Sequence, residues 1–202
     1  LDIEARLRQQ ADRELAASGS PGALLVYPLV AMVTAVAGEI LQNHPFWVVG
    51  EVSALLAIGA FRYRLGRRLL SAPVHEIAAA KRAYGSSILV TAWIWSGYTA
   101  LTVLNYGRSW TGLLSLLVTF AIVAASTANL VSDPRLMRVY VLLMIVPSSI
   151  SLAAHGGLSE LLTSLMLLVF CAFMINIGHR QTQRYLRLSR TLVELDQAKE
   201  AA

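Results

Sequence analysis

Residues 165–202 read LMLLVFCAFMINIGHRQTQRYLRLSRTLVELDQAKEAA, and most of the fold can be worked out from this stretch. An apolar run passes into a charged, helix-forming segment with only Gly178 at the junction. From Met174 to the end, one set of residues recurs at alternating steps of three and four, which is the a/d spacing of a coiled coil. These residues predict one helix that leaves a membrane bundle and continues as a dimeric signal relay: Met174, Gln181, Tyr185, Leu188, Leu192 and Leu195.

The composition places the chain among membrane proteins. Of its 202 residues, 56% are hydrophobic and 14% charged, and the mean hydropathy is +0.58. Ordinary soluble domains carry about a quarter charged residues, so this chain is too apolar for that class. The net charge of +5 is spread over separate segments that flank apolar runs, without a nucleic-acid motif. We therefore expect no nucleic-acid partner and attribute the positive charge to membrane topology.

Six apolar runs are long enough to span a bilayer, which takes about 20 helical residues. Very short turns separate the first from the second, the third from the fourth and the fifth from the sixth, so the runs form three hairpins. A longer basic segment, from Arg64 to Tyr84, joins the first two hairpins, and we expect it to be a surface-bound loop with a short helix after Pro73. The expected spans are Pro21–Leu41, Phe46–Tyr63, Gly85–Leu104, Trp110–Val131, Leu136–Ala154 and Leu158–Gly178.

The distribution of basic residues predicts the orientation. With both termini in the cytoplasm, sixteen of the 17 lysines and arginines lie on the inner side and only Arg108 lies outside, as the positive-inside rule requires. The sequence thus predicts an all-α membrane protein in three parts. These parts are an amphipathic cytoplasmic helix over residues 1–20, a six-helix membrane domain over 21–178 and a cytoplasmic signalling helix over 179–202.

Two glutamates in the first hairpin are the clearest candidates for a ligand site. Glu39 and Glu51 flank the turn that contains His44, and both lie roughly 7 to 9 Å from it at 1.5 Å per helical residue. Ionisable groups inside a span are costly, and they usually face the bundle interior. With His155 on another outer turn, the pair could hold a proton, a cation or the polar head of a small lipid-like ligand. The alternative is that both glutamates reach interfacial water and only position the hairpin.

Aromatic residues form the second candidate group. Trp47, Tyr106 and Trp110 lie near span ends, where aromatic side chains commonly mark the membrane interface. Trp93 and Trp95 lie nearer the middle of the third span. They would either line a ligand pocket or pack the helices together, and helix packing is the commoner role.

Motifs for catalysis are lacking in the sequence. It contains no phosphate-binding glycine loop, no HExxH helix, no nucleophile elbow and no metal-spaced cysteine and histidine cluster. We expect no cofactor, no metal ion and no catalytic activity in this chain. The single cysteine, Cys171, lies in an apolar run, where it is most simply a small buried side chain.

The segment Leu192–Ala202, LVELDQAKEAA, together with six tightly turned spans, resembles the amino-terminal membrane sensor of bacterial sensor histidine kinases, often hybrid ones. The resemblance implies a sensory input module, a parallel homodimer and a downstream kinase domain beyond Ala202. The same junction is similar to that of membrane-anchored diguanylate cyclases. A small proton- or ion-coupled transporter or channel is the third reading, which would explain the glutamates but not the coiled-coil spacing. The expected partners are membrane lipid, a second copy and a small or lipid-like ligand.

Overall fold

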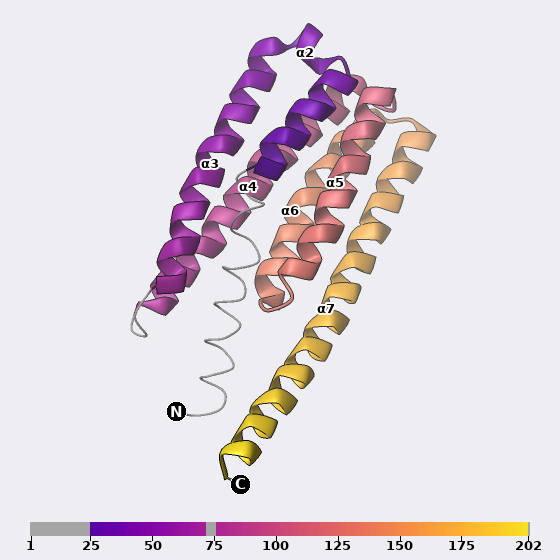
Figure 1. The fold of residues 1–202 in the computed structure, drawn as a ribbon. Helices are drawn as coiled ribbons and strands as arrows, with labels where there is room; N and C mark the ends of the chain where they lie inside the picture. Colours follow the sequence, from indigo (N-terminus) through magenta and orange to yellow (C-terminus); the bar gives the residue numbers. More distant parts are fainter. Residues whose placement is uncertain (1–24, 72–75, 202) are drawn as a thin grey trace.

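The computed structural model describes residues 25–71 and 76–201, with side chains for 25–71, 76–188 and 191 (Figure 1). The amphipathic helix expected over residues 1–20 lies outside these ranges. The described residues are almost entirely helical and contain no strand. The helices are Leu25–Ala37, α2 (Ile40–Asn43), α3 (Pro45–Ser71), α4 (Ile77–Tyr106), α5 (Trp110–Asn129), α6 (Pro134–Ala153) and α7 (Leu158–Ala201).

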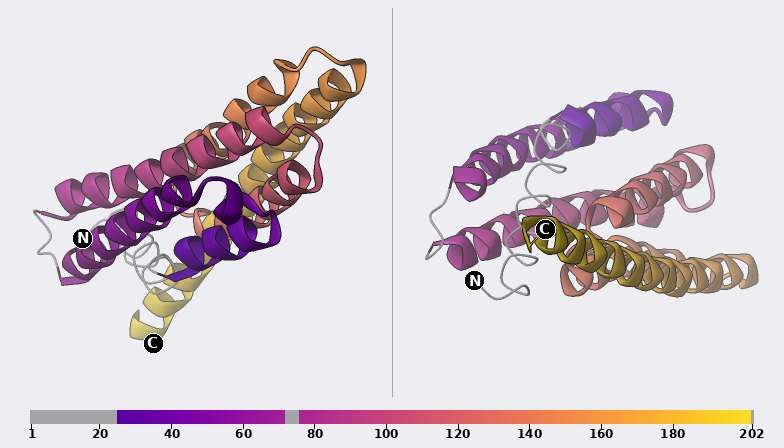
Figure 2. Two further views of the ribbon diagram at one scale, coloured as in Figure 1. Left: turned by 90° about the horizontal axis from the view of Figure 1, so that it is seen from above. Right: turned by 60° about the horizontal axis from the view of Figure 1, so that its bottom comes forward.

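Successive long helices run in opposite directions and form one bundle (Figures 1 and 2). Within the described residues, five helices, α3 to α7, are long and apolar enough to cross a membrane. The apolar helix Leu25–Ala37 is shorter, since the start of the expected first span lies outside the described residues. The chain is therefore an all-helical, multi-pass membrane protein.

Helices α4 and α6 form the centre of the bundle. Helix α4 packs against α3, α5 and α6, and α6 packs in addition against α7. In the most apolar stretch of α4, 56% of the residues are buried within the chain, against 22% in α3. The periphery is correspondingly rich in exposed leucine, valine and phenylalanine, such as Leu117 and Phe173. Lipid tails are the natural solvent for these side chains.

The predicted basic loop between the first two hairpins is wrong for most of its length. Helix α3 continues to Ser71 and α4 begins at Ile77, so Arg64–Ser71 and Ile77–Tyr84 are helical. Arginine, lysine, leucine and alanine are strong helix formers, and backbone bonds continue past the apolar part of a span at little cost. Length counted from hydropathy alone therefore placed the end of α3 too early and the start of α4 too late.

Caps and short turns set the ends of the middle helices. The Ser109 hydroxyl accepts a hydrogen bond from Gly112 N at 3.4 Å at the start of α5. The Asp133 carboxylate accepts one from Leu136 N at 3.1 Å at the start of α6, where Pro134 occupies the first turn. Both arrangements satisfy amide groups that a helix start leaves without a partner inside the helix.

A ladder of buried polar groups joins α4 to α5. Trp95 Nε1 donates to Thr119 Oγ1 at 3.0 Å, and the hydroxyls of Thr99 and Thr119 lie 3.1 Å apart. Thr119 also donates to Ser115 O, in the preceding turn of its own helix, at 2.8 Å. Within a hydrocarbon environment such bonds favour one packing of two helices over others.

Helix α7 is continuous over 44 residues, as predicted from the sequence around Gly178. Three contacts hold it against the bundle along its membrane part. Ser164 Oγ donates to Ser149 O at 2.8 Å, Phe170 stacks on Phe120 with ring centroids 4.6 Å apart, and Gly178 lies directly against the Met137 side chain. Beyond these contacts α7 extends past the ends of α5 and α6 (Figure 1).

Candidate functional site

The outer-turn residues predicted to form one ligand site lie at the same end of the bundle but in different environments. Glu39 is exposed in a left-handed backbone conformation, with φ 61°, between the helix Leu25–Ala37 and α2. Its carbonyl oxygen accepts from Gln42 N at 3.2 Å and Asn43 N at 3.3 Å. The Glu39 side chain therefore lies on the surface of a tight turn, which fits the positioning alternative.

Glu51 points into the bundle instead. Its side chain is half-buried on α3, and Oε1 is buried without a hydrogen-bond partner among the described residues. The hydroxyl of Tyr98, on α4, is also buried without such a partner, and the two groups are close enough to interact electrostatically. Glu51 and Tyr98 together make a polar spot between α3 and α4, while Glu39 remains outside it.

The two histidines both contact the turn between α4 and α5. His44 packs edge-to-face on Tyr106, with centroids 6.3 Å apart, and on Trp47 at 5.7 Å. His155 lies next to Gly107, and its Nδ1 is 3.1 Å from Ser151 O. Both imidazoles are exposed, so they belong to the rim of the bundle rather than to the Glu51 spot.

The two tryptophans predicted in the middle of the third span have opposite positions. Trp95 is fully buried, and its ring contacts Tyr27 and Tyr98 with centroids 5.9 and 5.8 Å away. Trp93 is 68% exposed on the outer face of α4. Trp95 is therefore a packing residue with a satisfied N–H, whereas Trp93 faces the surroundings of the bundle.

A chain of ring contacts, tilted between Trp95 and Tyr98 and edge-to-face in the others, links the bundle core to its rim. Trp95 contacts Tyr98, Tyr98 contacts Trp47 at 6.1 Å, and Trp47 contacts His44. Ring pairs at such distances contribute about 0.5–1.5 kcal/mol each beyond the area that they bury. The chain passes the Glu51 spot at Tyr98, so it holds α3 and α4 together around that carboxylate.

The upper half of the predicted relay seam packs within the chain. Met174 is buried in the core, Gly178 lies against Met137, and Gln181 is half-buried with a buried Oε1. Next to them, Thr182 Oγ1 donates to the carbonyl oxygens of Gly178 and Val131, each at 3.0 Å. This part of the seam therefore faces α6 and the α5–α6 turn. The three-four spacing in the sequence identified the apolar face of the helix but could not show which neighbour covers it.

The lower half of the seam has a different environment. Tyr185 is half-buried, whereas Leu188 is 63% exposed. The side chains of Leu192 and Leu195 lie outside the described residues, although the helix continues past both. A coiled-coil partner in a second copy would therefore begin near Leu188 and not at Met174.

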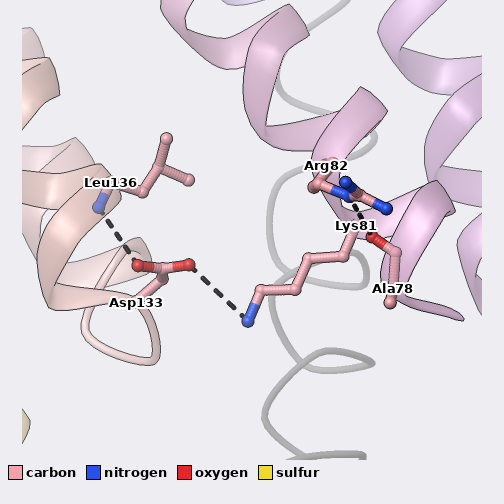
Figure 3. A network of polar contacts seen from close by, with 5 residues as sticks. All are labelled: Ala78, Lys81, Arg82, Asp133 and Leu136. Carbon is pink, nitrogen blue, oxygen red and sulfur yellow. Dashed lines mark hydrogen bonds and ion pairs between the residues drawn. The ribbon is translucent and has the colours of Figure 1, made fainter.

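A polar contact at the opposite end joins the starts of α4 and α6 (Figure 3). Lys81 Nζ lies 3.6 Å from Asp133 Oδ2, and Asp133 Oδ1 caps α6 through Leu136 N. Arg82 Nε donates to Ala78 O, one turn earlier in α4, at 3.3 Å. Since both partners of the ion pair are partly exposed, the pair itself contributes little, about 0–1 kcal/mol. The contact as a whole holds the starts of α4 and α6 next to each other along the bundle axis.

Arg62 is the residue that sequence reasoning missed. We counted it among the inner basic residues, yet it is only 8% exposed on α3, inside the bundle. Its guanidinium carbon lies 5.5 Å above the Tyr84 ring, and Nε has no hydrogen-bond partner among the described residues. Its position within the apolar run Phe46–Tyr63, before the other arginines of α3, was the available signal.

The described side chains offer no metal centre, since no group of three or more histidine, cysteine, aspartate or glutamate residues converges there. Cys171 is buried, as expected for a small apolar side chain. Comparisons of the chain with protein-family models, curated proteins and solved structures found no match. The function therefore has to be argued from the bundle itself.

Proposed function

We propose that this chain is the membrane-embedded sensory input module of a bacterial two-component histidine kinase, which relays a stimulus through α7. The observation that carries the proposal is the continuity of α7, from the outer turn at Leu158 through the bundle to Ala201. A single helix transmits a shift or rotation along its length, because each backbone bond couples one turn to the next. We further propose that the protein lies in the inner membrane with six spans and with both termini in the cytoplasm.

The contacts of α7 with its neighbours favour a relay over a static anchor. Ser164, Phe170, Gly178 and Thr182 touch α5, α6 or the turn between them, so a change in the core moves α7 directly. Among the described side chains after Thr182, Tyr185 is half-buried, whereas Leu186 and Leu188 are exposed. Small shifts of packed helices are a common form of switching in membrane and soluble receptors.

The proposed output surface is a short parallel coiled coil between two copies. It comprises Leu188, Leu192 and Leu195, which continue the three-four spacing beyond the bundle. The polar Lys199 at the next core position keeps such a coiled coil weak. A weak seam suits an element that alternates between two packings.

Glu51 and Tyr98 are the proposed entry point for a stimulus at the outer end, with His44 and His155 at its rim. Their support is the pair of buried polar atoms without partners between α3 and α4. Unpaired buried polar atoms cost about 1–3 kcal/mol each, so a proton or ligand group that pairs with them stabilises one arrangement of the two helices. Glu39, on the surface of its turn, has no part in this proposal.

The relay can be tested by insertions that rotate the part of α7 beyond the bundle. In the parent protein with its native continuation, insertion of one or two residues between Gln183 and Leu188 turns everything downstream by about 100° per residue. We expect such insertions to lock kinase output on or off, and an insertion of seven residues to restore regulation because the heptad frame returns. Regulation that survives all insertions equally would refute the relay.

Cysteine cross-linking tests the partner of the seam. Cysteines at Leu188 or Leu192 should cross-link between copies readily, and cysteines at Arg187 or Arg190, which lie off the three-four spacing, poorly. Equal cross-linking at the four positions, or a monomer in nanodiscs, would count against a dimeric coiled coil. A reporter fused after Ala202 that is active only in the cytoplasm would support the orientation.

Two other functions remain as alternatives with distinct outcomes. A diguanylate cyclase downstream would show a Gly-Gly-Asp/Glu-Glu-Phe motif after Ala202, in place of a His-Glu-Ile-Arg-Thr-Pro-like phosphoacceptor stretch. A transporter or channel is favoured by the half-buried Glu51 and the buried Arg62, since charges inside a bundle often mark a pathway. Substrate- or proton-driven flux in liposomes that contain only this chain would establish the transporter and overturn the sensor.

A further inference from the structure

A cavity of about 650 Å³ lies between the helix Leu25–Ala37 and α5. Its walls are mostly aliphatic, including Leu29 and Val33 on one side and Val118 and Ala125 on the other, and Ile88 of α4 forms its floor. Leu29 and Val33 are also exposed on the outer surface of the bundle. The cavity therefore opens sideways between two apolar helices, toward the lipid phase of a membrane.

One end of this apolar cavity carries a cation. Arg62 lines the cavity, more than nine-tenths of its side chain is buried, and its Nε has no hydrogen-bond partner among the described residues. The contact with the Tyr84 ring compensates the charge only in part. The ion pair recorded between described side chains joins Lys81 to Asp133 and does not include Arg62. A buried guanidinium in this state has several donors available for an anion.

Hydroxyl groups at the same end add a further donor. Tyr27 Oη lies 2.6 Å from Tyr140 Oη, and Tyr140 Oη lies 3.0 Å from Ser126 Oγ. All three residues line the cavity. Three hydroxyls carry three protons, and the two links between them use two. One proton is left to donate to an acceptor in the cavity, next to Arg62.

We propose that this cavity binds a single-chain amphipathic anion, a long-chain fatty acid, with its carboxylate on Arg62 and its chain along the helix Leu25–Ala37. A planar carboxylate matches the paired donors of a guanidinium. If a methylene fills roughly the space of a water molecule, about 30 Å³, a 16-carbon chain needs about 500 Å³ and two chains about 1,000 Å³. The cavity thus fits one chain, which separates a fatty acid from a bilayer phospholipid.

The site differs from the Glu51 spot in both charge and place. Glu51 lies on the part of α3 near the outer turn, whereas Arg62 lies three helical turns further along the same helix. The inference deepens the proposed function, because it names the class of ligand that a sensor of this kind would detect. Binding by the isolated chain tests it without any output domain, so failure of the relay experiments leaves it standing, and the reverse also holds.

The experiment uses the full chain in phosphatidylcholine nanodiscs and a palmitate that carries a diazirine in its chain. After irradiation, mass spectrometry should locate the adduct on the helix Leu25–Ala37 or on α5. Unlabelled palmitate should compete, whereas hexadecyltrimethylammonium, with the same chain and a positive head, should compete at least tenfold less well. Phosphatidylglycerol, an anion with two chains, should also compete weakly.

Variants separate the charge from the cavity. Arg62→Gln should weaken labelling about tenfold or more, because hydrogen bonds to a charged group are lost, and Arg62→Lys should retain most of it. Ala125→Phe fills the wall of the cavity and should weaken labelling to a similar extent. Ala124→Phe is the matched control, since Ala124 is also exposed on α5 but does not line the cavity, and it should bind as the unmodified chain does.

Each contrary result overturns the proposal. Unchanged labelling in Arg62→Gln together with Ala125→Phe, or equal competition by the cationic analogue, would refute an anion site in this cavity. Phosphatidylglycerol that competes as well as palmitate would make bilayer lipid the occupant. Labelling that appears only after removal of residues 1–20 would make the chain's own amino-terminal segment the occupant. Thermal melting of every variant, compared with the unmodified chain, excludes loss of folding as the cause.

Discussion

At Gly178, α7 lies directly against a side chain of α6, and adding one methyl group there tests how tightly the two helices are packed. A Cβ built on Gly178 would collide with the side chain of Met137, which is completely buried. Replacing glycine by alanine inside a helix ordinarily stabilises it by about 0.5–1 kcal/mol. Overpacking of a well-packed core costs about 1–3 kcal/mol. For Gly178→Ala we therefore expect a net loss of up to about 2.5 kcal/mol.

Gly97→Ala is the matched control. Gly97 lies inside α4, and a Cβ there would meet nothing within 4 Å. Only the gain in helix propensity applies, so this variant should be unchanged or more stable by up to about 1 kcal/mol. The difference between the two variants isolates the packing term, about 1–3 kcal/mol. Equilibrium unfolding in mixed micelles with increasing SDS measures both free energies.

A second substitution at Met137 identifies the contact. Met137→Ala alone should cost about 2–5 kcal/mol, because it empties a buried position. In its presence, Gly178→Ala should lose its penalty, which gives a coupling energy of about 1–3 kcal/mol between the two sites. Two results would refute the packing described for α7: equal effects at Gly178 and Gly97, or additive effects of Gly178 and Met137.

Three further substitutions test the polar contacts by the same unfolding measurement. Thr119→Val should cost about 1–3 kcal/mol by leaving the Trp95 N–H unpaired. Thr163→Val, at a half-buried position whose hydroxyl bonds only within its own helix, should change stability by no more than about 0.5 kcal/mol. Asp133→Ala should cost about 1 kcal/mol through loss of the α6 cap. Asp133→Asn keeps the cap and loses only the ion pair, so it should cost less than about 0.5 kcal/mol. Equal losses in the two variants would make the ion pair the dominant contact. Glu51→Gln should raise stability by about 1 kcal/mol, since it removes a half-buried charge whose Oε1 has no partner, and Glu39→Gln should have no measurable effect; a loss at Glu51 would mean that the carboxylate is a structural group.

The sequence predicted the features that depend on composition and spacing. Apolar runs located the five long apolar helices that the structure describes, and the absence of a break at Gly178 predicted the continuous α7, which the structure confirms. Hydropathy did not reveal how far α3 and α4 extend beyond their apolar parts, because arginine and lysine favour a helix as well as leucine does. Spacing identified the face of α7 that carries Met174 and Gln181, but not that α6 covers part of it.

Candidate sites were harder to predict, since they depend on the rotation of each helix. Glu39 and Glu51 lie at similar depth by residue count, yet the left-handed turn at Glu39 leaves that side chain on the surface while Glu51 faces inward. Arg62 looked like one more residue of a basic segment, although it lies inside the bundle. Its place within an apolar run set it apart from the other arginines, but the cavity that it meets is formed by helices distant in the chain, which that position alone does not identify.

The hydrogen bond from Thr182 to Val131 O ties α7 to the α5–α6 turn, and the part of the helix that continues from there to Ala201 has the length of a lever arm. From Thr182 to Ala201 the helix spans about 28 Å at 1.5 Å per residue. A tilt of about 5° at that contact moves the far end by roughly 2.5 Å, about half the distance between neighbouring helical turns. A displacement too small to disturb the packing of α6 and α7 thus becomes a larger one at the end of the helix, because the backbone hydrogen bonds keep the helix stiff.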